Sequence, residues 1–91
     1  RYTHISRDVA LLNDVPEGEL VREVVTDSAA DDAGIRVGDI ITHLGGEKLT
    51  EENSLAKIIR TKKVGDELTV RIFRDGGTID LTTKLKEAPN K

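Results

Sequence analysis

The C-terminal third of the chain has the clearest pattern of apolar and polar positions. Residues 68–72 and residues 79–85 alternate apolar with polar side chains over most of their length. A period of two places every second side chain on the same face, as in a strand with one buried face. Asp75 and Gly76 lie between the two stretches and are typical of a tight turn. We therefore predict a terminal β-hairpin.

A helical pattern precedes this hairpin, in residues 50–63. Its apolar stripe is Leu55, Ile58 and Ile59, with two glutamates in the first turn and basic residues in the last turns. That order of charges stabilises the helix dipole at both ends. Gly65 is expected to end the helix.

The N-terminal part alternates short strands with short helices. A β-prone segment at residues 2–5 ends at Ser6, which can cap a helix over residues 8–12. Pro16 and Gly18 are expected to close that helical segment.

The middle of the chain continues the alternation. Four of the residues 20–25 are apolar, namely Leu20, Val21, Val24 and Val25, and we interpret them as a strand covered on both faces. Ser28 can then cap a single helical turn that Gly34 ends in the left-handed conformation. A brief strand over residues 40–44 follows, with a turn on either side.

This order of elements predicts an α+β fold, namely a small, partly open antiparallel β-barrel or sandwich capped by two to three helices. A chain of 91 residues fits one domain with one modest core. We expect the domain to span residues 1–86. The alternation is lost in residues 87–91, which are expected to form a C-terminal tail or linker.

Composition narrows the possible functions. Charged residues make up 34% of the chain, the net charge is -3, and the aromatic side chains are Tyr2 and Phe73. A mixed, slightly acidic surface without stacking aromatics disfavours nucleic-acid binding. No apolar stretch reaches the roughly 20 residues that a membrane helix needs, so no direct membrane insertion is expected. Cysteine is absent, which excludes disulfides and thiolate chemistry.

The sequence contains no recognisable enzyme motif. The two histidines, His4 and His43, are far apart and have no acidic or second histidine neighbour at helical spacing, so neither a metal site nor acid–base catalysis is expected. Of the candidate nucleophiles Ser6, Ser28 and Ser54, two precede helices and are explained by capping. We expect no catalytic residue, no metal and no cofactor.

The segment from Ser28 to Ile41 resembles the signature of bacterial PDZ domains. That signature has a small-residue helical turn, an Ala-Gly-Leu-like step and an x-x-Gly-Asp step before two apolar residues; here it reads SAADDAGIRVGDII. Gly38 can form the turn, and the Asp39 carboxylate can accept backbone N–H groups there. A Lys-Val-Gly-Asp step before the hairpin matches the same family. The resemblance covers residues 18–85.

The N-terminal segment is similar to PDZ domains of HtrA/DegP-type trypsin-like serine proteases. Residues 2–21 look like the stretch in which a binding strand leads into a short inserted helix before a Gly-Ala-Leu-Val-like strand. Other PDZ subclasses usually lack that helix. The alternative is a PDZ interaction or scaffold domain of a non-proteolytic or metalloprotease-type protein.

One element of the family is not found in the sequence. PDZ domains carry a Gly-Leu-Gly-Phe-like loop, Tyr-Leu-Gly-Ile in the HtrA family, whose backbone N–H groups bind a peptide's terminal carboxylate. Either this loop lies before Arg1, or Tyr2-Thr3-His4-Ile5 is a degenerate form with His4 in place of glycine. The helix spacing after Ser6 favours the first alternative, which puts tight carboxylate capture by this chain in doubt.

The resemblance implies a module without catalytic machinery of its own. It captures C-terminal or unfolded peptide segments by β-strand addition, and it regulates or targets an attached serine protease. It also implies an extracytoplasmic parent protein, either periplasmic or membrane-anchored.

The resemblance places peptide-binding residues on one strand and one helix. The strand residues, carried over by position, are Arg1, Tyr2, Thr3, His4 and Ile5. The helix spans residues 51–62. There Leu55 and Ile59 are expected in the core, and the side chains expected to face a groove are Ser54, Ile58, Thr61 and Lys62. Ordinary core packing is the alternative for Ile58.

Overall fold

The computed structural model describes residues 2–50 and 52–85, and within these residues the chain forms six strands and three helices. In chain order the elements are β1 (Tyr2–Ile5), α1 (Arg7–Asn13), β2 (Gly18–Val21), α2 (Ala29–Ala33), β3 (Ile40–Leu44), β4 (Glu47–Lys48), α3 (Leu55–Arg60), β5 (Glu67–Arg74) and β6 (Gly77–Lys84). The predicted α+β class is confirmed. The short strand β4 was not predicted, and the expected tail at residues 87–91 lies outside the described residues.

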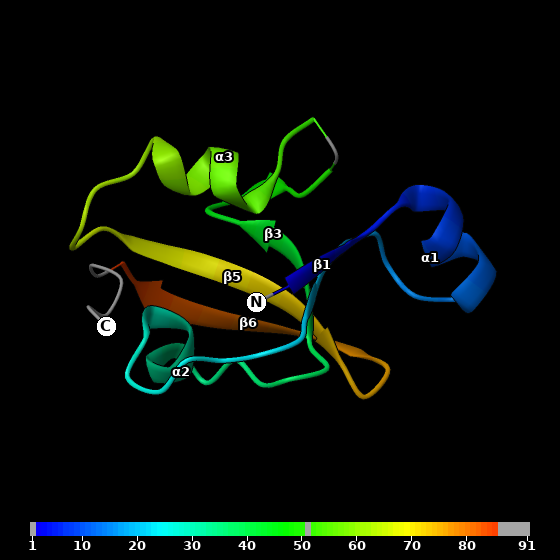
Figure 1. Ribbon diagram of the computed structural model, residues 1–91, viewed down its shortest axis with the longest axis horizontal. Coiled ribbons are helices and arrows are strands. Elements are labelled where there is room, and N and C mark those ends of the chain that lie inside the picture. Colours follow the sequence, from blue (N-terminus) through cyan, green and yellow to red (C-terminus); the bar gives the residue numbers. More distant parts are fainter. Residues whose placement is uncertain (1, 51, 86–91) are drawn as a thin grey trace.

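The strands form one antiparallel sheet in the order β1-β2-β3-β5-β6, with β4 paired to β3. The predicted hairpin is confirmed, since β5 and β6 pair along their whole length with Arg74 opposite Gly77 at the turn. β1 and β6 lie at the two ends of the order, so the sheet is open. In Figure 1, α3 lies above the strands and α2 below them, while α1 extends away from the sheet beyond the end of β1.

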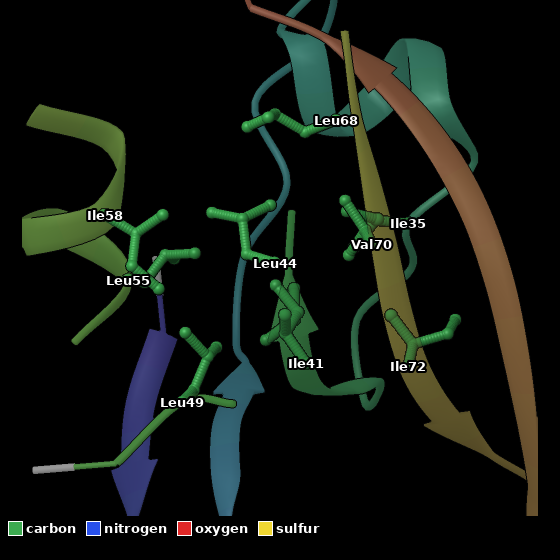
Figure 2. Packing of buried hydrophobic residues seen from close by; sticks show 10 residues of the cluster. Ile35, Ile41, Leu44, Leu49, Leu55, Ile58, Leu68, Val70 and Ile72 are labelled. Carbon is green, nitrogen blue, oxygen red and sulfur yellow. The ribbon is translucent and has the colours of Figure 1, made fainter. Parts of the chain in front are cut away.

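The core lies between α3 and the sheet. Leu55 and Ile58 point from α3 toward Leu44, and Val70 and Ile72 approach from β5 (Figure 2). Leu49 and Ile72 are completely buried. The alternation predicted for β5 is confirmed, because Leu68, Val70 and Ile72 are buried while their polar neighbours are exposed.

Each helix begins at a serine. The hydroxyl oxygens of Ser6, Ser28 and Ser54 accept a hydrogen bond from the backbone N–H three residues later, at 3.2–3.3 Å. Capping is therefore the structural role of all three serines. For α3 this moves the start from the predicted residue 50 to Leu55, because Thr50 forms a separate turn with Asn53.

Two boundaries differ from the predicted ones near β2. The helix α1 ends at Asn13 with Asp14 in the left-handed conformation, before Pro16, and Gly18 is the first residue of β2. β2 itself ends at Val21, where Arg22 and Glu23 interrupt the apolar residues of the segment. Val25 is half exposed, so the expected strand does not extend over the second apolar pair.

Gly34 ends α2 with a positive φ of 89°, as the sequence predicted. A Cβ at this position would meet no atom within 4 Å, so the cost of any substitution is backbone strain alone. We expect Gly34→Val to lower the free energy of unfolding by more than about 1 kcal/mol, because a β-branched residue strongly disfavours this conformation. Asparagine tolerates a positive φ better, so Gly34→Asn should lower the free energy of unfolding by less than Gly34→Val does. Equal melting temperatures for both variants and the natural chain would contradict this account.

Candidate functional site

The strand predicted to bind peptide lies at an edge of the sheet. β1 pairs with β2 on one side, with Tyr2 opposite Val21 and Ile5 opposite Gly18. Its other side has no partner strand among the described residues, because β1 is the first strand in the sheet order. An exposed strand edge presents unpaired backbone N–H and C=O groups that another extended chain can use. We call this side of the strand the β1 edge.

The helix predicted to face this strand lies beside it. Both views place α3 next to the β1 end of the sheet (Figures 1 and 2). The expected division of its apolar side chains is wrong for Ile59, which is 40% exposed and does not join the core. Ile58 is 2% exposed and belongs to the core cluster with Leu55. This agrees with core packing, which was the alternative considered for Ile58. Residues 55 and 58 are three apart and share one helix face, whereas Ile59 is turned about 100° away.

The other predicted helix residues lie at the two ends of α3. Ser54 is half-buried and its hydroxyl caps the helix. Thr61 is exposed, and its hydroxyl donates to the Ile58 carbonyl oxygen at 2.8 Å. Lys62 is half-buried and follows the helix. Their part in binding stays a prediction.

The predicted strand residues differ in exposure. Tyr2 and Thr3 are exposed, and Ile5 is half-buried. The Thr3 hydroxyl accepts a hydrogen bond from Arg22 at 3.4 Å, on the face of the sheet opposite to His4. Arg1 lies outside the described residues. Tyr2–Ile5 is strand over its whole length, so this segment does not itself form a loop.

A buried acid lies beside β1, on the neighbouring strand β2, and was missed by sequence reasoning. His4 is opposite Glu19 in the register of β1 and β2, and His4 Nδ1 lies 3.1 Å from Glu19 Oε1. Glu19 is 1% exposed, and the His4 side chain is 27% exposed. His4 Nε2 and Glu19 Oε2 are buried and have no hydrogen-bond partner in the described part of the chain. Side chains two positions apart in a strand lie on the same face, so the buried position of Val21 would have predicted that Glu19 is also on the buried face.

A second buried carboxylate anchors the turn before β3. Arg74 Nε donates to Asp39 Oδ1 at 2.8 Å and Nη2 to Oδ2 at 2.6 Å, while the Arg36 N–H also donates to Oδ2. Burial alone would raise the pKa of Asp39, but the bonds from Arg74 and Arg36 outweigh it and hold the pKa below its usual value. The predicted role of Asp39 as an acceptor of backbone N–H is confirmed; the partner Arg74, 35 residues later, was not foreseen.

The remaining histidine has a hydroxyl and not a carboxylate as its hydrogen-bond partner. His43 Nδ1 lies 2.9 Å from the Thr42 hydroxyl on β3, and burial together with Arg71 and Lys48 lowers its pKa. Residues 2–50 and 52–85 contain no group of three metal-ligating side chains. In the same residues no helix is long and apolar enough to cross a membrane.

Comparison with known families identifies the domain. A model of the PDZ domain family matches residues 7–85 of this chain. The chain belongs to the PDZ domain family. PDZ domains are binding modules, which agrees with the expectation that this chain has no catalytic machinery of its own.

The curated relatives of this PDZ domain are HtrA/DegP-type proteins, which confirms the subclass that the sequence suggested. The chain is 33% identical over 79 residues to the periplasmic serine endoprotease DegP of Escherichia coli, covering 87% of this chain and 17% of that protein. It is 37% identical over 70 residues to a probable periplasmic serine protease of Haemophilus influenzae, covering 77% of this chain and 15% of that protein. The chain thus spans about a sixth of the length of these relatives.

Solved structures share the fold. The HtrA-type protease AlgW with a decapeptide matches with a TM-score of 0.76 at 17% identity, over 100% of this chain and 29% of that one. An aminopeptidase N family protein from Idiomarina loihiensis matches with a TM-score of 0.80 at 27% identity, over 98% of this chain and 13% of that one. The same domain fold therefore occurs in proteins with different names and activities.

Proposed function

We propose that this PDZ domain binds extended peptide segments, which add as a strand to the β1 edge beside α3. The observation that carries the proposal is the open edge of β1, at the first position of the sheet and next to a helix. Backbone hydrogen bonds along such an edge supply affinity without regard to sequence, and side-chain contacts with the helix add selectivity. The relative AlgW was solved with a decapeptide, which supports this mode of binding.

We further propose that the domain is a regulatory or targeting module of a serine protease outside the cytoplasm. The curated relatives named above are serine proteases described as periplasmic, and this chain corresponds to a small part of each. In that setting the domain would capture unfolded or C-terminal peptide segments. It would then either deliver these segments to an attached protease domain or change the activity of that protease when they bind.

The residues assigned to binding follow from their exposure. Tyr2, Thr3, His4 and Ile5 supply the strand, together with Arg1 by position. On the helix, Ser54, Thr61 and Lys62 remain candidates at its two ends. Ile58 is covered in the free protein, so it would contact a peptide only as part of the floor of the site.

The test is a titration with a pair of ten-residue peptides that differ only in backbone N-methylation. The peptides are rich in Val and Thr, and one carries N-methyl groups at two adjacent inner positions, so that one of the two amides points toward β1 in either register. Strand addition predicts that the methylated peptide binds about tenfold more weakly, because each lost backbone hydrogen bond contributes about 0.5–1.5 kcal/mol. Equal affinity of both peptides in calorimetry would contradict binding by strand addition.

Carboxylate recognition is tested by a second pair of peptides, one with a free C-terminal carboxylate and one with a C-terminal amide. The chain as it stands should bind both weakly and with little discrimination. A chain lengthened before Arg1 by Tyr-Leu-Gly-Ile should prefer the free acid at least tenfold, since hydrogen bonds to a charged group are worth about 1.5–3 kcal/mol. If the lengthened chain binds the free acid and the amide with equal affinity, the loop does not bind the terminal carboxylate.

A further inference from the structure

The pair of His4 on β1 and Glu19 on β2 leaves two buried polar atoms without a partner among the described residues. His4 Nδ1 and Glu19 Oε1 are joined at 3.1 Å, but His4 Nε2 and Glu19 Oε2 are buried without a partner. Buried polar groups in proteins are nearly always hydrogen-bonded, because an unpaired one keeps its desolvation penalty. Two such atoms in one pair, on the strand proposed to receive a ligand, indicate a site whose hydrogen bonds are completed on binding.

The protons of the pair can be assigned from its burial. A neutral His4 that donates from Nδ1 to an ionised Glu19 would leave an uncompensated negative charge in a side chain that is 1% exposed, which is costly. Two compensated forms place a proton in the contact between Nδ1 and Oε1: an imidazolium with a carboxylate, and a neutral imidazole whose Nδ1 accepts the carboxyl proton from Glu19 Oε1. In both of these forms His4 Nε2 carries a hydrogen. The unpaired nitrogen is therefore a donor, and it needs an acceptor.

The direction from which an acceptor could come follows from the sheet geometry, and this step rests on the proposed function. In an added strand, the residue opposite His4 projects its side chain on the same face as His4, with the two Cβ atoms about 4.5–5.5 Å apart. Glu19 occupies the place on the other side of His4, and beyond it Ile41 continues the row. A ligand side chain opposite His4 would thus be the next member of that row.

We propose that His4, held by Glu19, is a specificity-determining residue that selects a hydrogen-bond acceptor in the ligand, such as a hydroxyl or a carboxamide side chain opposite His4. An apolar side chain leaves Nε2–H unpaired. A lysine or arginine has no acceptor to offer. A carboxylate can also accept this hydrogen bond, and an imidazolium at His4 would favour it.

The test uses ten-residue host peptides with valine at the inner positions and lysines at the N-terminal end for solubility. Each inner position is replaced in turn by Thr, which is isosteric with Val, or by Asn. At one position, Thr should bind about tenfold more tightly than Val, and Asn should also bind more tightly than Val. A ¹⁵N-detected spectrum of the His4 ring should show a protonated Nε2 in the free chain, with its proton exchanging more slowly once the Thr peptide is bound.

The decisive variant replaces the whole pair, as His4→Leu with Glu19→Met. Replacing a buried ion pair by apolar residues of similar volume is often neutral or stabilising, so this variant is expected to fold, and its melting curve checks it. It should bind the Val peptide at least as well as the Thr peptide. The matched control is Thr82→Val, which changes an exposed residue of β6 at the opposite end of the sheet and should keep the preference for Thr.

The outcomes separate the two proposals. If the Thr and Val peptides bind with equal affinity at every position, His4 does not determine specificity, but strand addition is not contradicted. A preference for Thr that survives in the double variant, or an unprotonated Nε2 in the free chain, would also overturn the role of His4. Failure of every host peptide to bind would contradict the proposed function itself, and the inference with it.

Discussion

Replacing Ile58 by alanine is expected to lower the free energy of unfolding by about 3 kcal/mol, within the 2–5 kcal/mol typical of buried isoleucines. The side chain is 2% exposed and packs with Leu55 against the sheet side chains shown in Figure 2. Removing three carbon atoms there loses apolar burial and leaves a cavity. Chemical denaturation followed by circular dichroism measures the change.

The adjacent residue is the matched control for this prediction. Ile59→Ala removes the same atoms from a side chain that is 40% exposed, so its cost should stay below about 0.5 kcal/mol. A lysine at position 58 should prevent folding rather than remove peptide binding selectively. If Ile59→Ala is as destabilising as Ile58→Ala, the orientation of α3 described above is wrong.

Asp39→Ala is expected to lower the free energy of unfolding by about 2–3 kcal/mol. Breaking a fully buried ion pair costs about 3–5 kcal/mol, and the effect here should be smaller because the side chain of Arg74 is 18% exposed. The substitution leaves the Arg74 guanidinium and the Arg36 N–H without their acceptor. The exposed pair of Arg71 and Asp80 is the control, and Asp80→Asn should leave the melting temperature nearly unchanged.

The Asp39 carboxylate should also make the stability of the domain depend on pH. Because its pKa is lower in the folded chain than the ordinary value of about 3.9, its contribution is fully present above that value and is lost as the pH falls through the folded pKa. Between pH 5 and pH 2 the natural chain should therefore lose more stability than Asp39→Asn does. Parallel stability profiles for the two proteins would show that Asp39 is not stabilised as an anion.

Local signals in the sequence were sufficient for much of the fold. Period-two alternation identified β5 and β6, the serines marked helix starts, and Gly34 was correctly expected at positive φ. These features depend on residues within a few positions of one another. Gly18 shows the limit: a Cβ there would lie 2.2 Å from the Ile41 carbonyl oxygen, so glycine is required by a contact 23 residues away that no local pattern contains.

The site was less predictable for the same reason. Leu55, Ile58 and Ile59 form one apolar stripe, and only the position of the sheet decides which of the two isoleucines is covered. The pair of His4 and Glu19 joins residues 15 apart through the register of β1 with β2. The free edge of β1 follows from the strand order. Each of these facts belongs to the tertiary arrangement. The family resemblance indicated a strand and a helix for the site, and their part in binding stays a prediction.

The central claim, strand addition at the β1 edge, is tested most directly by amide hydrogen exchange measured by NMR with and without a saturating Val- and Thr-rich ten-residue peptide. The β1 amides that point away from β2 should exchange at least about tenfold more slowly in the complex, because they gain hydrogen bonds to the added strand. The amides of β6, at the opposite end of the sheet, should be unaffected. Unchanged exchange throughout Tyr2–Ile5 at saturation, or protection confined to β6, would contradict the account.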